Sequence, residues 1–561
     1  MPAPPPPRCH RRTATAIVGV LALAAVTTGC GSSDSAGSAT EATAEDRLPP
    51  TVTIEADGDP TAGGELAYGI EAESEGWNPT KTRWATSGTL VGASIFDTLA
   101  AFDDTGRVVP YLAEEITPNG NFTEWTVVLR DGVTFHDGQP LTSEAVKLVL
   151  DQHVGSPLTG PIVEPIDRVD TPDARTAVVV MKEPWSAFPA VLTGQIGMVP
   201  APSQLNDPTD GNVTRPVGTG PFVFDSWIRD SELVVERNED YWREGLPYLD
   251  SVTFTPLPDP AERLNALEAG TIDVAHVRDP ATVAEARELA AARDAQVILD
   301  PTEPEELFLM LNSGRAPFDD LDARRAVAFA VEVDRYNGAF GEDIAEPATG
   351  PYPETSQWFA DSEWPEADPA KARELVTAYE EEHGPMAVTF LATKTPDDIA
   401  SAGLLEAMLE EVGIDVETRF LEQGDLFLQA SAGTYDVALW RQWSAPDPDG
   451  EYLWWHSSTS QPVGQLSINV GRLEDPEIDE ALDTGRGTLD ETTRIEAYAE
   501  LQMRLTEQVP YVWINHVPWT IVADTDVRDL PNGPLPDGQA SLPFGGPASG
   551  SHRLTQVWID S

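Results

Sequence analysis

The chain has 561 residues, too many for one hydrophobic core, so two or three domains are expected. Hydrophobic residues make up 41% of it, which excludes a disordered chain. Its formal net charge of −59 excludes a surface that binds nucleic acid or anionic lipid headgroups, and we interpret the charge as solubility.

The N-terminus has the layout of a secretory signal. A basic stretch at 8–12 precedes an apolar run at 13–26 and the sequence TTGC. As a helix the run would measure about 21 Å, short of the roughly 30 Å of a hydrocarbon core. We therefore expect 1–29 to be a signal peptide and the Ser/Ala/Gly-rich segment 30–62 to be a flexible tether.

The ending Gly29-Cys30 resembles a bacterial lipobox, in which Cys30 would be acylated and become the first residue of the mature chain. The usual Leu and Ala/Ser are replaced by Val26 or Thr27 and by Thr28. An ordinary signal peptide with a chance cysteine is the alternative. The other cysteine, Cys9, also precedes the body of the chain, which excludes a disulfide framework and a catalytic cysteine there.

Turn residues and hydrophobic periodicity predict the first elements. The pattern indicates a strand at 63–70 and a helix at 89–102. Strands at 125–129 and 133–135 follow, each ending in an Asp-Gly or His-Asp-Gly turn. A helix is expected at 140–154, with Thr142 or Ser143 as its N-cap and Glu144 in its first turn.

The later part of the chain alternates helices and hydrophobic strands, which is typical of α/β domains. The expected elements are a helix, a turn and a strand within 262–277, a strand at 305–313, one amphipathic helix at 320–340, a helix at 368–384 between Asp368 and Gly384, a strand at 386–393, a helix and a strand within 404–422, and a strand at 435–443.

His136 lies beside Asp137, with Asp131 and Glu144 near in sequence, which raises the question of a catalytic or metal site. Each acid has a structural use, because the two aspartates precede turn glycines and Glu144 begins a helix. We therefore interpret His136 as a side chain that satisfies a backbone group.

No motif of a hydrolase, zinc protease or P-loop is present, and no two histidines have the helical spacing of a metal pair, so we expect no catalytic residues, no metal and no cofactor. The acidic run at 446–451 hints at calcium but lacks the full ligand spacing. Tryptophan is abundant, with fifteen residues. Most should lie in the core, but aromatics between Pro, Gly and acids are often pocket walls, and we name as candidate ligand contacts Trp77, Trp84, Trp440 and Trp443.

Seven ordered segments together resemble the peptide/nickel family (family 5) of extracellular solute-binding proteins, which deliver ligands to ABC importers. They cover roughly 63–530 and are 95–116, 125–146, 217–227, 236–254, 266–275, 311–335 and 435–449. The resemblance implies a non-enzymatic, monomeric α/β protein with the two-lobed fold of periplasmic binding proteins (type II, large cluster with an extra subdomain).

In that fold the ligand is enclosed between two lobes joined by two chain crossings. Here lobe I is expected at 63–302 plus 522–561, with a subdomain near 98–216, and lobe II at 303–521. The implied partners are a peptide or small-molecule ligand, ABC permease subunits, and the membrane through a lipid anchor at the extracellular face of the cell.

One segment departs from the family pattern. Many peptide-binding members place an acid after Trp-x-Ala, where it holds the α-amino group of the ligand, but here Ala445 is followed by Pro446 and then Asp447. Either Asp447 takes this role in a shifted register, or it only shapes an Asp-Pro turn. A peptide is the expected ligand, and an oligosaccharide or a metal complex is the alternative ligand. An extracellular hydrolase is the alternative function.

Overall fold

The computed structural model describes residues 53–54, 58–341, 344–443, 447–544 and 551–560, without the side chains at 300–304 and 443. Cys30, the apolar run at 13–26 and most of the expected tether lie outside the described residues. Within the described ranges, no helix has the length and apolar character needed to cross a membrane.

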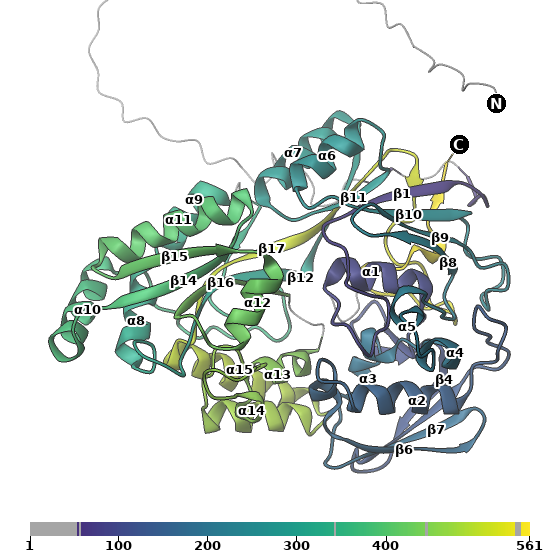
Figure 1. The fold of residues 1–561 in the computed structure, drawn as a ribbon, viewed down its shortest axis with the longest axis horizontal. Coiled ribbons are helices and arrows are strands. Elements are labelled where there is room, and N and C mark those ends of the chain that lie inside the picture. The colour runs from purple at the N-terminus through teal and green to yellow at the C-terminus, as the bar shows by residue number, and fades with distance from the viewer. Residues whose placement is uncertain (1–52, 55–57, 342–343, 444–446, 545–550, 561) are drawn as a thin grey trace, which may run out of the picture. The chain divides into compact units, whose positions relative to one another are not determined.

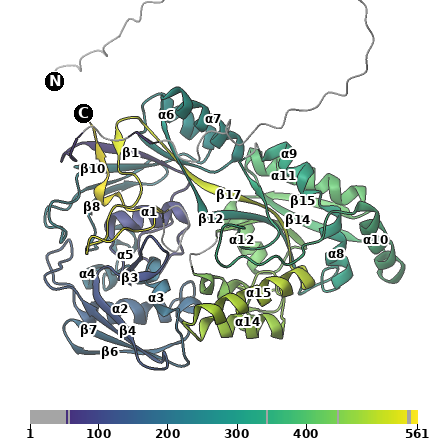
Figure 2. The same ribbon diagram turned by 180° about the vertical axis from the view of Figure 1, so that it is seen from behind.

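One mixed sheet of eleven strands organises the chain (Figures 1 and 2). Its order is β15-β14-β16-β12-β17-β11-β1-β10-β9-β8, and β13 pairs with β17 outside this path. The strands are β1 (Glu65–Ile70), β8 (Phe222–Ile228), β9 (Glu232–Arg237), β10 (Ser251–Pro256), β11 (Val274–Val277), β12 (Gln296–Leu311), β13 (Glu346–Pro347), β14 (Ala387–Thr393), β15 (Asp415–Leu421), β16 (Val437–Trp443) and β17 (Tyr511–Ala523).

The two long strands β12 and β17 connect the two ends of this sheet. They pair in an antiparallel manner over two stretches, with a register irregularity between Asp300 and Glu305. Beyond one stretch lie β11, β1, β10, β9 and β8, called the β1 side below. Beyond the other lie β16, β14 and β15, called the β14 side.

Alternating apolar residues on β12 give the β14 side two cores, because successive side chains of a strand point to opposite faces. Leu307 and Leu309 pack in the core formed with the first group of helices, and Phe308 and Met310 in the core formed with the second. The first group is α8 (Leu321–Ala330), α9 (Val333–Phe340), α10 (Pro369–His383) and α11 (Pro396–Glu411); the second is α12 (Gln423–Ser431), α13 (Tyr452–Trp455), α14 (Pro476–Arg486) and α15 (Glu491–Gln508).

The β1 side carries α6 (Pro260–Glu268) and α7 (Pro280–Ala292) over one core and α1 (Thr86–Ile95) over another. A separate four-stranded sheet, β4-β5-β7-β6, forms its own core with α2 (Ser143–Val154). The remaining elements are β2 (Ala100–Phe102), β3 (Val108–Pro110), β4 (Ala113–Pro118), β5 (Glu124–Leu129), β6 (Ile166–Asp173), β7 (Thr176–Met181), α3 (Phe188–Val191), α4 (Pro202–Leu205), α5 (Gly211–Thr214), β18 (Val527–Arg528), β19 (Trp558–Ile559) and short 3₁₀ turns that include η4 (Pro448–Glu451).

Most predicted elements are confirmed, and three differ. The helix expected at 89–102 ends at Ile95 and is followed by β2. The strand expected at 133–135 is wrong, because only Thr134 makes a bridge, to Pro140. The single helix expected at 320–340 is interrupted after Ala330, where Val331 and Glu332 leave the helical conformation.

The structural interpretation of His136 is confirmed. Its Nδ1 accepts a hydrogen bond from the backbone N–H of Gly218 at 3.2 Å, and its Nε2 lies 3.0 Å from the carbonyl oxygen of Gly220. Burial lowers its pKa to about 4, so the ring is neutral at physiological pH. The histidine thus fastens the turn after β5 to the 218–220 loop.

Candidate functional site

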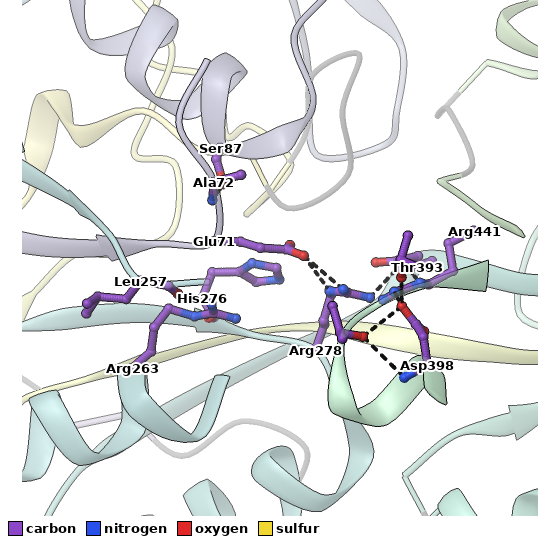
Figure 3. Close-up of polar contacts among 12 residues, drawn as sticks. Glu71, Ala72, Ser87, Leu257, Arg263, His276, Arg278, Thr393, Asp398 and Arg441 are labelled. Atoms are coloured by element: carbon purple, nitrogen blue, oxygen red, sulfur yellow. Dashed lines mark hydrogen bonds and ion pairs between the residues drawn. The ribbon is translucent and has the colours of Figure 1, made fainter. Parts of the chain in front are cut away.

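Five charged side chains from the β1 side and the β14 side form one network, and Figure 3 labels four of them, Glu71, Arg278, Asp398 and Arg441. Glu71 directly follows β1, and Arg278 directly follows β11. These two strands are parallel neighbours, so their carboxyl ends meet at one edge, where ligands of α/β proteins commonly bind. Glu305 lies in β12, and Arg441 lies in the neighbouring strand β16.

Arg278 is the link between the two sides. Its Nη2 lies 2.8 Å from Oε1 of Glu71 and its Nη1 lies 3.3 Å from Oε1 of Glu305. Arg441 approaches the same Glu305 oxygen with its Nε at 3.6 Å and holds Asp398 with its Nη2 at 2.8 Å. A single chain of ion pairs therefore runs from the end of β1 to the first turn of α11.

Asp398 is held in position by its own helix terminus. Thr395 is the N-cap of α11, and its hydroxyl oxygen accepts a hydrogen bond from the N–H of Asp398 at 3.2 Å. The Asp398 carboxylate in turn accepts hydrogen bonds from the hydroxyls of Thr393 and Thr395. These hydrogen bonds fix the orientation of the carboxylate that pairs with Arg441.

The network holds three acids and two arginines, so one acid is in excess. Burial would raise the pKa of Glu71, but Arg278, His276 and Arg263 hold it below its usual value. Glu305 is the excess acid: burial raises its pKa to about 7, an effect that Arg278 opposes and that Glu71 and Asp398 reinforce. Near neutral pH the network can therefore gain or lose one proton at Glu305.

Replacing Glu305 by Gln should stabilise the fold, by about 2 kcal/mol more at pH 8 than at pH 5. The pKa of Glu305 is about 7 in the folded protein and near about 4.3 in an unfolded chain, so folding favours the protonated form. The stability that this proton provides is complete below the unfolded value and is lost as the pH rises through the folded value. Glutamine keeps the uncharged shape at both pH values.

Urea unfolding of wild type and Glu305→Gln at pH 5 and pH 8 measures the effect. Glu410→Gln, on the exposed face of α11, is the matched control for removing an acid outside the network. An equal change at both pH values for Glu305→Gln would contradict the assignment of a raised pKa to this residue.

A second connection between the two sides lies away from the sheet. The indole N–H of Trp185 donates a hydrogen bond to Oδ2 of Asp449 at 2.9 Å, and Arg486 pairs with Oδ1 of the same carboxylate at 2.6 Å. The hydroxyl of Ser186 donates to the carbonyl oxygens of Arg486 and Thr488 at 2.6 and 2.7 Å. All of these groups except Thr488 are buried, and we call them the latch.

The candidate ligand residues from the sequence are placed as follows. Asp447 binds Arg494 with both oxygens, at 2.6 and 3.0 Å, and also caps η4 by accepting from the N–H of Asp449. Trp77 and Trp84 are buried together in the core beneath α1, and Trp440 is buried in the core of the β14 side. The side chain of Trp443 and residues 444–446 lie outside the described residues.

The structure thus brings none of the four described candidates into the network, and their roles as ligand contacts stay predictions. The sequence patterns did not single out Glu71, Arg278, Glu305, Asp398 and Arg441. A usable signal was present for two of them, because Glu71 and Arg278 are charged residues placed directly after predicted strands.

One other feature of the described chain has no connection to the network. A surface hollow of about 660 Å³ is lined by three arginines and three acids, so its charges balance; they are Arg130, Arg175, Arg243, Glu114, Asp131 and Glu244. Among the described residues, no cluster of His, Cys, Asp and Glu has the arrangement of a metal site.

Comparison with known proteins identifies the family. The family model "Bacterial extracellular solute-binding proteins, family 5 Middle" matches residues 107–464. The chain is 28% identical over 486 residues to di/tripeptide-binding protein 2 of Pseudomonas aeruginosa, covering 80% of this chain and 89% of the relative. It is 25% identical over 478 residues to the nickel-binding periplasmic protein of Escherichia coli, covering 80% and 88%.

A solved structure shows the same fold. The periplasmic binding protein of Helicobacter pylori in complex with the peptide STSA superposes with a TM-score of 0.78 at 22% identity, covering 89% of this chain and 99% of that one. The predicted two-lobed α/β fold of periplasmic-binding-protein type is thereby confirmed. The chain belongs to family 5 of the bacterial extracellular solute-binding proteins.

Proposed function

We propose that this protein captures a peptide between its two lobes and delivers it to the permease of an ABC importer. The observation that carries the proposal is the network, in which Arg278 joins Glu71 at the end of β1 to Glu305 on the strand that links the lobes. Its arginines offer charge-assisted hydrogen bonds to the carboxylate end of a short peptide.

The lobes that close on the ligand are proposed to be 63–302 plus 522–561 and 303–521, with a subdomain near 98–216. The irregular register between Asp300 and Glu305, where β12 passes from one stretch of pairing to the other, supports this boundary. The four-stranded sheet with its own core supports the subdomain. We infer that the protein is a monomer without catalytic activity.

The candidate contacts Trp77, Trp84, Trp440, Trp443 and Asp447 remain part of the proposal. Asp447 would reach a ligand ammonium only by sharing its carboxylate with Arg494, which now binds both of its oxygens. An oligosaccharide or a metal complex is the alternative ligand. The nickel-binding relative favours the second of these within the family.

Calorimetric titration with a panel of di-, tri- and tetrapeptides tests the proposal. We expect binding of at least one length class with a dissociation constant in the micromolar range or below, about −8 kcal/mol. Arg441→Met should weaken that binding, because it removes one of the two cations of the network. If no peptide binds but a sugar or a nickel complex does, the ligand is not a peptide and only the solute-binding role stands.

We also propose that Cys30 is acylated and that 30–62 tethers the protein to the extracellular face of the cell membrane. Cys30→Ser should move the protein from the membrane fraction to the medium, because a diacyl anchor holds a protein that a single chain would not. Immunoblots of the two fractions measure the change, with Cys9→Ser as the matched control. Unchanged membrane retention of Cys30→Ser would contradict the anchor.

A further inference from the structure

Two buried carboxyl groups of lobe II lie near Gln442, on the side of the sheet opposite to the network. The register pairs Glu306 of β12 with Gln442 of β16 and with His516 of β17, so these three side chains share one face. The amide of Gln442 donates a hydrogen bond to the carboxylate of Glu451, at the end of η4. Glu306 and Glu451 are 1% and 3% exposed.

Within the described part of the chain, neither acid forms an ion pair. The pKa of Glu451 is raised to about 8, chiefly by burial, and that of Glu306 is raised well above its usual value by burial and by Glu451 and Glu305. His516 does not supply the missing charge, because burial lowers its pKa to about 4. Arg494 and Arg486 are already bound by Asp447 and Asp449.

A third polar group points to an absent partner. Tyr352 is 3% exposed, and its buried hydroxyl has no hydrogen-bond partner among the described residues. Its pKa is raised by burial first and then by Glu451, Tyr498 and Glu306, and its ring belongs to the core that contains Phe308 and Tyr452, which are close in sequence to the two acids. Glu306 also has a carboxylate oxygen, Oε2, with no partner in the described structure.

This arrangement is costly unless something binds to it. Ionising either buried acid without a cation costs several kcal/mol, and a buried hydroxyl without a partner costs about 1–3 kcal/mol. The acids also lie close to the opposite lobe, because η4 carries Asp449 of the latch, two residues before Glu451. A ligand between the lobes would therefore approach them.

We infer that Glu306, Glu451 and Tyr352 form a subsite in lobe II that takes a positively charged group of the ligand, an ammonium or a guanidinium. The inference rests on the proposed function, since it names the chemistry of the captured solute. Both carboxylates accept hydrogen bonds from the cation and the tyrosine oxygen accepts a third, which satisfies the groups that have no partner. The charged group can come from a peptide N-terminus or from a basic side chain.

The first experiment uses a small cation, so that it does not depend on peptide binding. Butylammonium chloride is titrated against the protein at pH 8, and the apparent affinity is taken from the rise in melting temperature. Sodium chloride at equal ionic strength and 1-butanol at equal concentration are the controls for screening and for the apolar chain. We expect a rise with butylammonium beyond both controls.

Glu306→Gln and Glu451→Gln keep the shape of the protonated acids, and each should lower the apparent butylammonium affinity at least tenfold. Glu410→Gln, an exposed acid on α11, is the matched variant and should bind as wild type. Two variants on different elements guard against a folding defect in either. No rise beyond the controls in wild type, or full retention of the rise in both variants, would overturn the inference.

A second set of ligands identifies the source of the charge. Trialanine carries only an α-ammonium, and N-acetyl-Ala-Lys-Ala carries only a side-chain ammonium. If the subsite binds the charged group, Glu306→Gln should bind one of these two peptides at least tenfold more weakly than wild type. The affinity for N-acetyl-trialanine, which has no ammonium group, should not change. A butylammonium effect without binding of any peptide would remove the peptide from the proposed function and leave the subsite intact.

Discussion

Replacing Arg278 by Met should lower the free energy of unfolding by about 3 kcal/mol, because it leaves two largely buried acids without their shared cation. The side chains of Arg278, Glu71 and Glu305 are 18%, 29% and 11% exposed, so solvent screens the pairs only in part. The loss should be smaller at pH 5 than at pH 8, since Glu305 takes up a proton as the pH falls through about 7. Urea unfolding at both pH values gives the two numbers.

Arg335→Met is the matched control for this prediction. Arg335 also bridges two acids, Glu332 and Glu411, but all three side chains are exposed, and such pairs contribute about 0–1 kcal/mol. A double-mutant cycle of Arg278→Met with Glu71→Gln isolates the pair itself. If Arg278→Met proves no more harmful than Arg335→Met, the network does not hold the two lobes together.

Replacing Asp449 by Asn should lower the free energy of unfolding by about 3 kcal/mol and also weaken ligand binding. Arg486 would stay buried without a counterion, with its guanidinium over the ring of Tyr452. The same change weakens the bond from Trp185, which connects the two proposed lobes within the latch. An exposed acid on β15, Asp415→Asn, should change neither property.

Trp185→Phe separates the two effects of the latch. It removes the indole N–H and leaves the pair of Asp449 with Arg486 in place. A hydrogen bond to a charged group contributes about 1.5–3 kcal/mol, so ligand affinity should fall roughly ten- to a hundredfold if the latch stabilises the closed form. Unchanged affinity in a folded Trp185→Phe protein would show that the latch is only structural.

Local signals were sufficient for many elements. Helix α10 begins after Asp368 and ends before Gly384, as predicted. The Asp368 side chain accepts hydrogen bonds from the N–H groups of Ala370 and Lys371, and Gly384 has a positive φ of 86°. The break between α8 and α9 has no Gly or Pro to mark it. Both helices pack on the same core, and apolar spacing alone does not reveal that the chain breaks between them.

The site was less predictable because its contacts are long-range. Glu71 and Arg278 are 207 residues apart and meet only through the parallel pairing of β1 with β11. A tryptophan near a turn is typical both of a core and of a pocket wall, so its sequence context does not decide between them. Trp77 and Trp84 lie buried in a core. Asp447 looked like either a turn residue or a ligand contact, and the structure shows the turn and a pairing with Arg494 from α15.

Native mass spectrometry of the protein purified without unfolding from the cells that produce it tests the central claim most directly. The account predicts one short peptide bound per protein chain, carrying at least one basic group and released when the lobes are opened by mild denaturation. Fragmentation of the released ligand would give its sequence. A bound sugar or metal complex, or a peptide without any basic group, would contradict it.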